Sequence, residues 1–444
     1  MAKTFRPWQV DQVWLLPASV RELVPTGDPA HFVRDLVREE LDLSGILAAY
    51  DEERGFPPYH PAMMTALLLY AYTQGVYSSR RIARACQTRV DFMAVTAMQQ
   101  PDFRTVSDFR KRHLEGLGGL FGQVLKLCQR ARMVTLGHVA LDGTKVKANA
   151  SKHKAMSYAR MKKTEKELAA EVARWFAEAE AVDEAEDREY GEDKRGDELP
   201  EWVKDKAKRL KVIRAAKAEL EAEAKAKLAA GEKSEPDNPD PHKPRRRDRK
   251  KPKSNGEPND KAQLNFTDKD SKILKGPDGY LQGYNCQAAV DANAQVIVAH
   301  ATNNEQNDAP QLPTMLAQIK RNTGRQAKEL SADTGYLSDH NLRELKRRRV
   351  RGYIATARQA RGAGKPLPTA AKTPLAIEMR LKLQRAGYRS RYRLRKQVVE
   401  PAFGQIKEGR GFRRFLLRGL DKVPHEWALV CTAHNLTKLV QRAA

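Results

Sequence analysis

A short stretch near the end of the chain combines one carboxylate with several cations at helical spacing. Each residue of an α-helix advances about 100° around the axis, so side chains at i and i+7 share a face. Such a carboxylate could hold a metal ion while the cations beside it hold a phosphate. The same pattern is also typical of an amphipathic helix with i,i+4 ion pairs. The cations within about 40° of Glu400 in this projection are Arg393, Lys396 and Lys407.

The opposite side of this stretch is apolar. Val398, Val399 and Phe403 fall there, so the helix is expected to pack against a core. Arg395 falls on the same apolar side. Pro401 lacks a backbone donor, so we expect the helix to kink at Glu400 or to begin there.

Two aspartates each follow a strand-like segment and precede a glycine or a Thr-Gly pair. Asp142 ends the alternating segment that begins at His138, and Gly143 is expected to turn the chain; Asp333 ends the segment that begins at Lys328. A strand-end carboxylate is a common metal ligand, although the Asp-Gly pair taken alone favours a plain turn. Oxygen ligands without a His or Cys cluster favour Mg²⁺ or Mn²⁺. Two strand-end carboxylates and a third on a packed helix can hold two such ions, which makes Asp142, Asp333 and Glu400 the candidate metal ligands.

The composition points to a polyanionic partner. The chain has 444 residues, 81 of them Lys or Arg against 56 Asp or Glu, and a net charge of +25. Such an excess is most typical of proteins that bind nucleic acid. No apolar run approaches the ~18 residues of a membrane span, and no signal core is present, so we expect a cytoplasmic protein, associated with the nucleoid, without membrane contact. The four cysteines lack metal-ligand spacing and suit a reduced compartment.

The first 135 residues read as helical, with a basic helix that Ser78 and Ser79 cap after a glycine turn. This resembles a helix-turn-helix in outline, although any small helical bundle contains such pairs. We expect Thr105 to cap one further helix, which runs to about Arg132. The candidate DNA-binding residues of the basic helix are Arg80, Arg81 and Arg84.

Strand signals return in the second half of the chain. Two segments, 283–291 and 295–300, read as a hairpin, and Asn307–Pro310 reads as the start of a helix. An Ala/Glu/Lys-rich region over 151–230 reads as a long helical hairpin, for which a solvated arm without chemistry is the plain interpretation. The basic segment Lys243–Lys253 is expected to be a linker that can hold phosphates without reading sequence.

These elements predict an α/β fold with a mixed five-stranded sheet flanked by helices, an all-α N-terminal domain and a helical insertion after the first core strand. The expected ranges are 1–135 for the helical DNA-binding domain, 136–150 for the first part of the catalytic core, 151–260 for the insertion with its basic linker, and 261–444 for the rest of the core.

Six motifs together resemble the DDE transposases of bacterial insertion sequences, in particular the IS eleven-eighty-two-like branch. The resemblance implies an RNase H-like core with Asp142, Asp333 and Glu400 as the catalytic triad and two Mg²⁺ or Mn²⁺ ions. It also implies DNA binding by the N-terminal helices, cleavage at transposon ends, transfer of the 3′-hydroxyls to target DNA, and a homodimer or larger complex that holds two ends. The motifs are Ala140–Lys145, Gly283–Asp291, Ser331–Tyr336, Val399–Lys407, Phe415–Leu420 and His434–Leu439.

The chain departs from the wider superfamily at one point. That superfamily carries Tyr, two residues, Arg, three residues, Glu, six residues, Lys, whereas four residues separate Arg395 from Glu400 here. We therefore assign catalytic phosphate binding to Lys396 and Lys407, and we assign no role to Tyr392 and Arg395. The alternative to a transposase is a non-catalytic DNA-binding protein descended from one, because charge and helices fit both.

Overall fold

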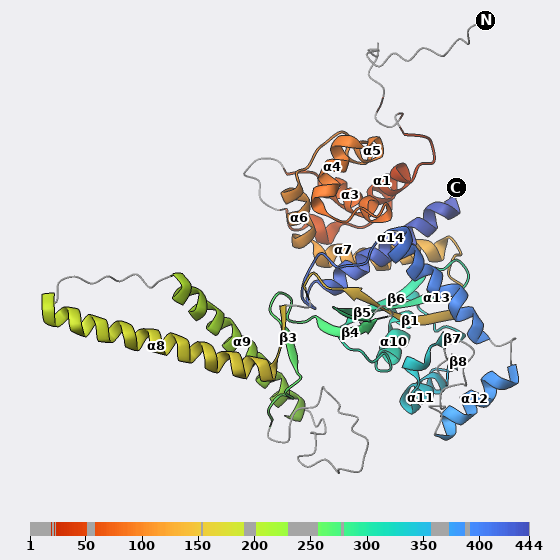
Figure 1. The fold of residues 1–444 in the computed structure, drawn as a ribbon. Coiled ribbons are helices and arrows are strands. Elements are labelled where there is room, and N and C mark those ends of the chain that lie inside the picture. The colour runs from red at the N-terminus through yellow and green to blue at the C-terminus, as the bar shows by residue number, and fades with distance from the viewer. Residues whose placement is uncertain are drawn as a thin grey trace, which may run out of the picture.

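The computed structural model describes residues 19, 22, 24–50, 58–151, 154–190, 201–229, 256–276, 279–356, 373–386 and 391–443. Figure 1 shows a group of N-terminal helices above an α/β core, from which a long helical arm projects. The predicted basic linker, Lys243–Lys253, lies outside the described residues.

The core is built on a mixed sheet. β5 pairs antiparallel with β1, which in turn pairs parallel with β7, and β7 pairs parallel with β8. β4 and β6 pair with successive parts of β5. The predicted mixed sheet is confirmed, and β4 adds a sixth strand to it. The strands are β1 (His138–Lys147), β4 (Lys272–Gly276), β5 (Gly279–Asp291), β6 (Ile297–Asn303), β7 (Glu329–Ala332) and β8 (Arg351–Ile354).

Helices cover the sheet. In the view of Figure 1, α14 lies above the sheet and α10 below it, and both pack on β6. α13 packs against β1, β5 and β7, because its Val398, Val399 and Ala402 form the apolar face that the sequence predicts. The helical elements of this half are α10 (Gln311–Thr323), η2 (Thr334–Tyr336), α11 (Asp339–Arg347), α12 (Pro374–Ala386), η4 (Arg391–Arg393), α13 (Leu394–Gly404), η5 (Gln405–Gly409) and α14 (Val423–Ala443).

The N-terminal region is helical, as predicted, but its last part forms two helices where one was expected. Asp102, not Thr105, caps the next helix, because its Oδ1 accepts from the Thr105 N–H at 2.8 Å. The single helix expected to run to Arg132 is wrong, since the chain breaks at His113, whose ring is buried beside Tyr50. The helices are α1 (Pro29–Glu39), α2 (Ser44–Leu47), α3 (Pro61–Thr73), α4 (Ser79–Thr88), α5 (Val90–Thr96), α6 (Phe103–Arg112) and α7 (Leu114–Arg130).

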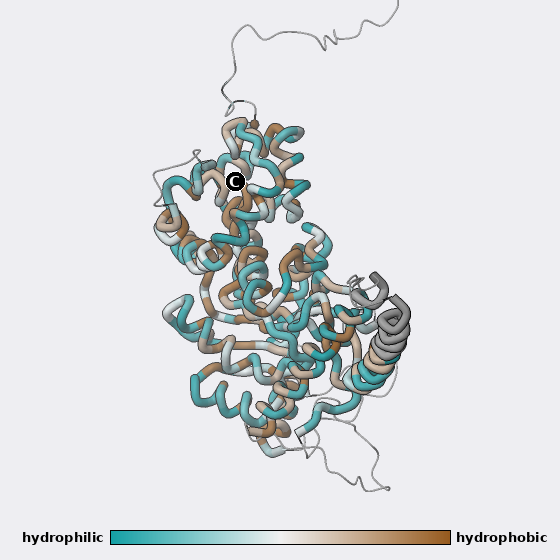
Figure 2. The backbone as a smooth tube through the Cα atoms, turned by 90° about the vertical axis from the view of Figure 1, so that its left-hand side faces the viewer, coloured by the Kyte–Doolittle hydropathy of each residue, from teal (hydrophilic) through white to brown (hydrophobic). Residues whose placement is uncertain are grey.

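One apolar core joins the N-terminal helices to the sheet. α14 packs on α3 and α7 with one part of its surface and on β6 with another. Trp427 is fully buried within α14, and its indole N–H donates to the Gln287 carbonyl of β5 at 3.1 Å. Figure 2 shows the hydrophobic segments lying inside the body of the molecule. The last helix of the chain therefore fixes the position of the first helices relative to the sheet.

The arm follows β1 along the chain and returns ahead of β4. It consists of β2 (Ala155–Ser157), α8 (Tyr158–Tyr190), α9 (Glu201–Ala229) and β3 (Gln263–Asn265), with β2 and β3 paired antiparallel. Its own small core includes Tyr158, Met161, Ile213 and Leu220. The predicted helical hairpin is thus confirmed. None of the helices in the described ranges combines the length and the apolar character needed to cross a bilayer.

Candidate functional site

Asp142 and Asp333 meet where the pairing of β1 with β7 ends. The last registered pair of these parallel strands is Leu141 with Ala332, so the next residue on each strand is the aspartate. The Asp333 side chain accepts from the Gly335 N–H at 2.8 Å and caps η2. The structure therefore brings together two carboxylates that the entire arm separates along the chain.

Gly143 does not turn the chain, contrary to the prediction. β1 continues to Lys147, because β5 offers it an antiparallel partner over its whole length. At Asp142 only the pairing of β1 with β7 has ended, while the pairing with β5 continues. The glycine serves a different purpose, since a Cβ there would lie 2.6 Å from Gln287 Nε2 and 2.9 Å from Asp308 Oδ1.

Arg395, to which the sequence assigned no role, joins Asp142 to Glu400. Its guanidinium contacts Asp142 Oδ2 at 2.5 Å and Glu400 Oε1 at 3.4 Å. The projection placed Arg395 correctly on the packed side of the helix, but that side faces the end of the sheet where Asp142 lies. Its guanidinium also lies 6.0 Å from the centre of the Tyr392 ring, so Tyr392 and Arg395 act in one cluster.

The cations assigned from the projection lie in different surroundings. Lys407 is in the π-helical turn η5, and its Nζ donates to the Lys145 carbonyl of β1 at 2.9 Å. Burial lowers the pKa of Lys407 from its ordinary value. Lys396 and Arg393 are exposed on the outer side of the same segment, as is Glu400. Lys407 thus contacts the β1 backbone beyond Asp142, whereas Lys396 and Arg393 are exposed to solvent.

Asp308 is a member of the site that the sequence reasoning missed. Its Oδ1 accepts from Asn285 Nδ2 at 2.6 Å and from Gln287 Nε2 at 2.9 Å, and it lies 3.3 Å from Lys145 Nζ. The residue was read as part of a helix-start signal, but the helix N-cap is Pro310 and makes no side-chain bond. The sequence did offer a signal for Asp308, since it is a third aspartate that closely follows the predicted hairpin of residues 283–300.

Burial dominates the electrostatics of the two strand-end aspartates. It raises the pKa of Asp142 to about 7, an effect that Arg395 opposes and Asp333 reinforces. Burial also raises the pKa of Asp333, and Asp308 adds to that rise. The site therefore carries carboxylates whose ionised forms are incompletely compensated, which is the condition that a bound cation relieves.

The stability of the metal-free protein should consequently depend on Asp142. A carboxyl whose pKa is higher in the folded chain than its ordinary 3.8 costs stability once it ionises. Its contribution to the free energy of unfolding should fall, by roughly 1–4 kcal/mol, as the pH rises from about 4 to about 7. In urea titrations without divalent ions, Asp142→Asn should therefore lack this fall in the free energy of unfolding between about pH 4 and about pH 7. Identical pH profiles for the two proteins would contradict this account.

The chemical type of the donors suits a hard dication, but their present arrangement does not complete a ligand set. Asp142, Asp333 and Asp308 offer only oxygen, the type of ligand that Mg²⁺ and Mn²⁺ prefer. Within the described ranges, no three acidic, histidine or cysteine side chains are gathered closely enough to ligate one ion. Arg395 stands between Asp142 and Glu400, so Glu400 could join the aspartates only after this guanidinium moves.

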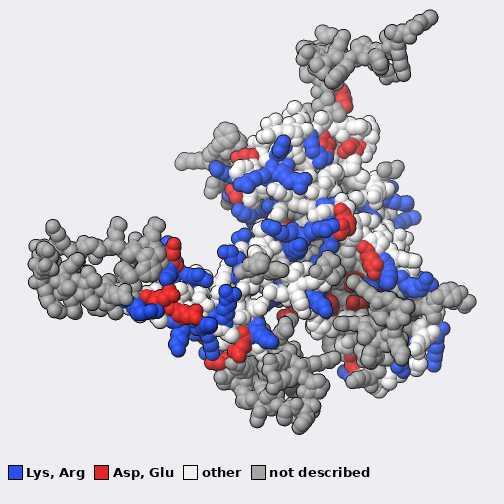
Figure 3. Space-filling model, viewed as in Figure 1, with Lys and Arg blue, Asp and Glu red and all other residues white. Residues whose placement is uncertain are grey.

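The N-terminal candidates form a separate basic surface. Arg80, Arg81 and Arg84 are exposed on α4, whose Ile82 and Cys86 are buried on the opposite side. α4 packs on α5 and α6, away from the acidic cluster. Figure 3 shows Lys and Arg side chains over the N-terminal helices and onward across the core. The two groups of predicted residues therefore divide between two parts of the molecule.

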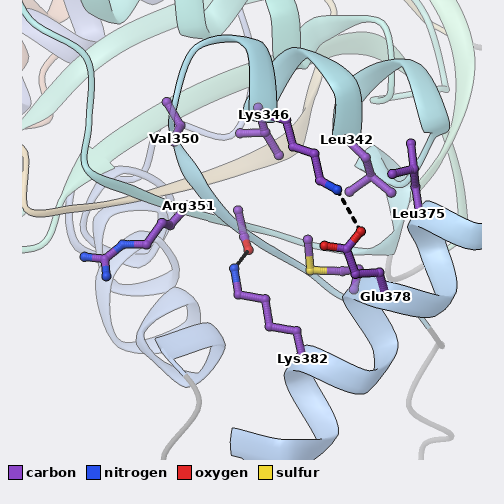
Figure 4. A pocket seen from close by; sticks show the side chains of 10 residues that line it. Leu342, Lys346, Val350, Arg351, Leu375, Glu378 and Lys382 are labelled. Carbon is purple, nitrogen blue, oxygen red and sulfur yellow. Dashed lines mark hydrogen bonds and ion pairs between the residues drawn. The ribbon is translucent and has the colours of Figure 1, made fainter.

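A cavity of about 220 Å³ lies between α11, β8 and α12 (Figure 4). It has apolar walls that include Leu342 and Val350, and the Lys346–Glu378 ion pair of 2.7 Å at its rim. It lies at the start of β8, at the opposite end of β7 from Asp333. Since Glu378 is the one carboxylate among the described residues that line it, the acidic cluster is the better candidate for chemistry.

The comparisons with known families agree with this arrangement. Residues 18–112 match a family described as a transposase domain (DUF772), and residues 358–440 match one described as a transposase DDE domain. The first match contains the basic face of α4, and the second contains Glu400. Neither a curated protein nor a solved structure matches the chain significantly.

The mixed sheet with flanking helices defines, together with the DDE match, an RNase H-like catalytic fold. Over residues 18–112 and 358–440 the chain is thus similar to transposases, and the two matches support a DDE transposase.

Proposed function

We propose that this transposase binds the ends of an insertion sequence, cleaves phosphodiester bonds there and joins the freed 3′-hydroxyls to target DNA. The observation that supports this most directly is the meeting of Asp142 and Asp333 where the pairing of β1 with β7 ends, with Arg395 linking Asp142 to Glu400. Buried carboxylates repel phosphates, so a protein that only binds DNA gains nothing from them.

The reacting phosphate would be held by the cations around the acidic cluster. Arg395 and Lys407 would orient it from α13 and η5, with Lys396 at the outer edge. Asp142, Asp333 and Glu400 would hold two Mg²⁺ or Mn²⁺ ions, which activate the attacking water or 3′-hydroxyl and stabilise the leaving oxygen. Arg395 would release Glu400 for this purpose and remain available to the phosphate.

The test uses a duplex that carries the terminal inverted repeat flanking the gene. Mg²⁺-dependent cleavage at the repeat boundary, followed by joining to a plasmid, is the expected result. Two ends must be held at once, so we expect a dimer or larger complex to form on the DNA. Specific binding without cleavage in Mg²⁺ or Mn²⁺ would instead favour a binding-only descendant of a transposase.

End binding should depend on the basic face of α4. Arg80→Ala combined with Arg84→Ala should weaken binding to end DNA about tenfold or more and lower the slope of log K against log salt by about two, because two phosphate contacts are lost. Gel-shift titrations at several salt concentrations measure both quantities. Lys320→Ala with Arg321→Ala, which removes two exposed charges from α10, is the control. Equal behaviour of the two double variants would place recognition elsewhere.

Asp308 should support the two strand-end aspartates. Asp308→Asn keeps the size of the side chain but removes the charge that Lys145 and the two amide donors face. We expect a loss of about 1–3 kcal/mol in the free energy of unfolding and a tenfold to hundredfold slower cleavage, roughly. Asp205→Asn, at an exposed position of α9, is the control. Wild-type cleavage by Asp308→Asn would show that this network is only structural scaffolding.

A further inference from the structure

A pocket of about 260 Å³ lies at the start of α4, apart from the acidic cluster. It combines the first residues of α4, one side of α6 and the segment ahead of α14. Among the described residues, no carboxylate lines it. The lining residues are Ser78, Ser79, Arg80, Phe103, Ser107, Arg110 and Leu416.

Arg110 gives this pocket a buried cation with an unused donor. The residue is only 5% exposed. Its Nη1 donates to the Tyr77 carbonyl at 2.9 Å and its Nη2 to Ser79 Oγ at 3.2 Å, whereas its Nε has no partner within the described chain. Arg110 also attracts the buried carboxylate of Glu426, but that carboxylate accepts from the backbone N–H groups of Leu416 and Leu417 and does not line the pocket. A buried donor of this kind is costly unless a ligand accepts from it.

The start of α4 supplies further donors. Ser78 is the N-cap, but its side chain makes no capping hydrogen bond. The first backbone N–H groups of a helix have no acceptor within the helix, and the helix dipole places positive potential there. The Arg80 guanidinium lies 5.2 Å from the centre of the Phe103 ring, which holds a second cation at the rim. Hydroxyls, N–H groups and two guanidinium groups form the type of site that takes a phosphate.

Exposed cations lie along the segment between the pocket and the end of β1. Arg414 and Arg418 are exposed on either side of Leu416. Arg414 forms a backbone bridge with Lys147, the last residue of β1. From Asp142 to Lys147 the strand spans about 17 Å. A nucleic-acid strand that enters the acidic cluster could therefore follow this edge to the pocket.

We propose that the pocket at the start of α4 binds one backbone phosphate of the end DNA, away from the phosphate that is cut. The inference rests on the proposed function for the identity of its ligand. It goes beyond that function by assigning Arg110, Ser78, Ser79 and Ser107 to a phosphate site between the N-terminal helices and the core.

The test places a carboxylate in the pocket. Ser107→Asp should lower the affinity for the inverted-repeat duplex about tenfold and reduce the salt slope by about one. Ser107→Asn, with nearly the same shape and no charge, should bind more tightly than Ser107→Asp. Ala317→Asp, at an exposed position of α10, should bind like the wild type. Circular dichroism and thermal unfolding confirm that each variant is folded.

Single methylphosphonates along the duplex then locate the phosphate. One neutralised position should weaken wild-type binding and have no further effect on Ser107→Asp, because the two changes remove the same contact. Additive penalties at every position would overturn the proposal. So would a free-anion site, in which Ser107→Asp abolishes stabilisation by inorganic phosphate and leaves DNA affinity unchanged. Failure of the wild type to cleave in Mg²⁺ would refute the proposed function alone, since this comparison depends only on binding.

Discussion

Asp142→Asn and Asp333→Asn are each expected to slow end cleavage about a thousandfold or more, while leaving end binding nearly unchanged. Each change keeps the shape of the side chain and removes the charge that a dication would neutralise. The two carboxylates lie on adjacent strands, so they should act as one unit, and the double variant should be little worse than either single one. End binding should survive, because it depends on the basic surfaces.

Single-turnover cleavage in Mg²⁺, measured beside gel-shift binding, decides the matter. Ca²⁺ should permit binding without efficient cleavage, because its coordination is larger and looser. Glu400→Gln should show the same loss as the aspartate changes if Glu400 is the third ligand. A Glu400→Gln protein that cuts at the wild-type rate would remove Glu400 from the catalytic set and leave Asp308 as the third carboxylate to test.

Arg395→Ala is expected to slow cleavage about a hundredfold or more at saturating Mg²⁺. The Arg395 side chain is 12% exposed, and its guanidinium bridges Asp142 and Glu400 with separate N–H groups. Removing it leaves two carboxylates without their shared cation and detaches the first turn of α13 from the sheet. Arg395→Lys should recover part of the cleavage rate, because a lysine restores the charge but not the two N–H groups that contact both carboxylates.

Lys396→Ala is the matched control, one position along the same helix and exposed. It should be milder, since Lys396 is proposed to meet phosphate only at the outer edge. The measurement is again single-turnover cleavage, with Mg²⁺ titrations to separate metal affinity from rate. A severe Lys396→Ala defect beside a mild Arg395→Ala defect would reverse these two roles and restore the assignment made from the helical projection.

Local sequence patterns predicted most of the elements because they are encoded by neighbours in the chain. The alternation ahead of Asp142 became β1, and the predicted hairpin became β5 and β6. The apolar side of α13 packs on the sheet as its periodicity indicates. The candidate triad came from motifs in the sequence, and the structure places Asp142 beside Asp333 and joins Asp142 to Glu400 through the Arg395 guanidinium.

Tertiary structure alone decided which polar groups meet. A helical projection gives each side chain a direction but does not say which residue lies opposite it. Arg395 therefore received no role from the sequence, although its guanidinium contacts Asp142. Asp308 became part of the site because the loop after β6 returns to β5, where Asn285 and Gln287 donate hydrogen bonds to its carboxylate. The extent of β1 depended on its partner β5, and the pocket of Arg110 depended on α4, α6 and Leu416 converging from distant parts of the chain. Contacts of this kind arise from packing between elements, which periodicity within one element does not encode.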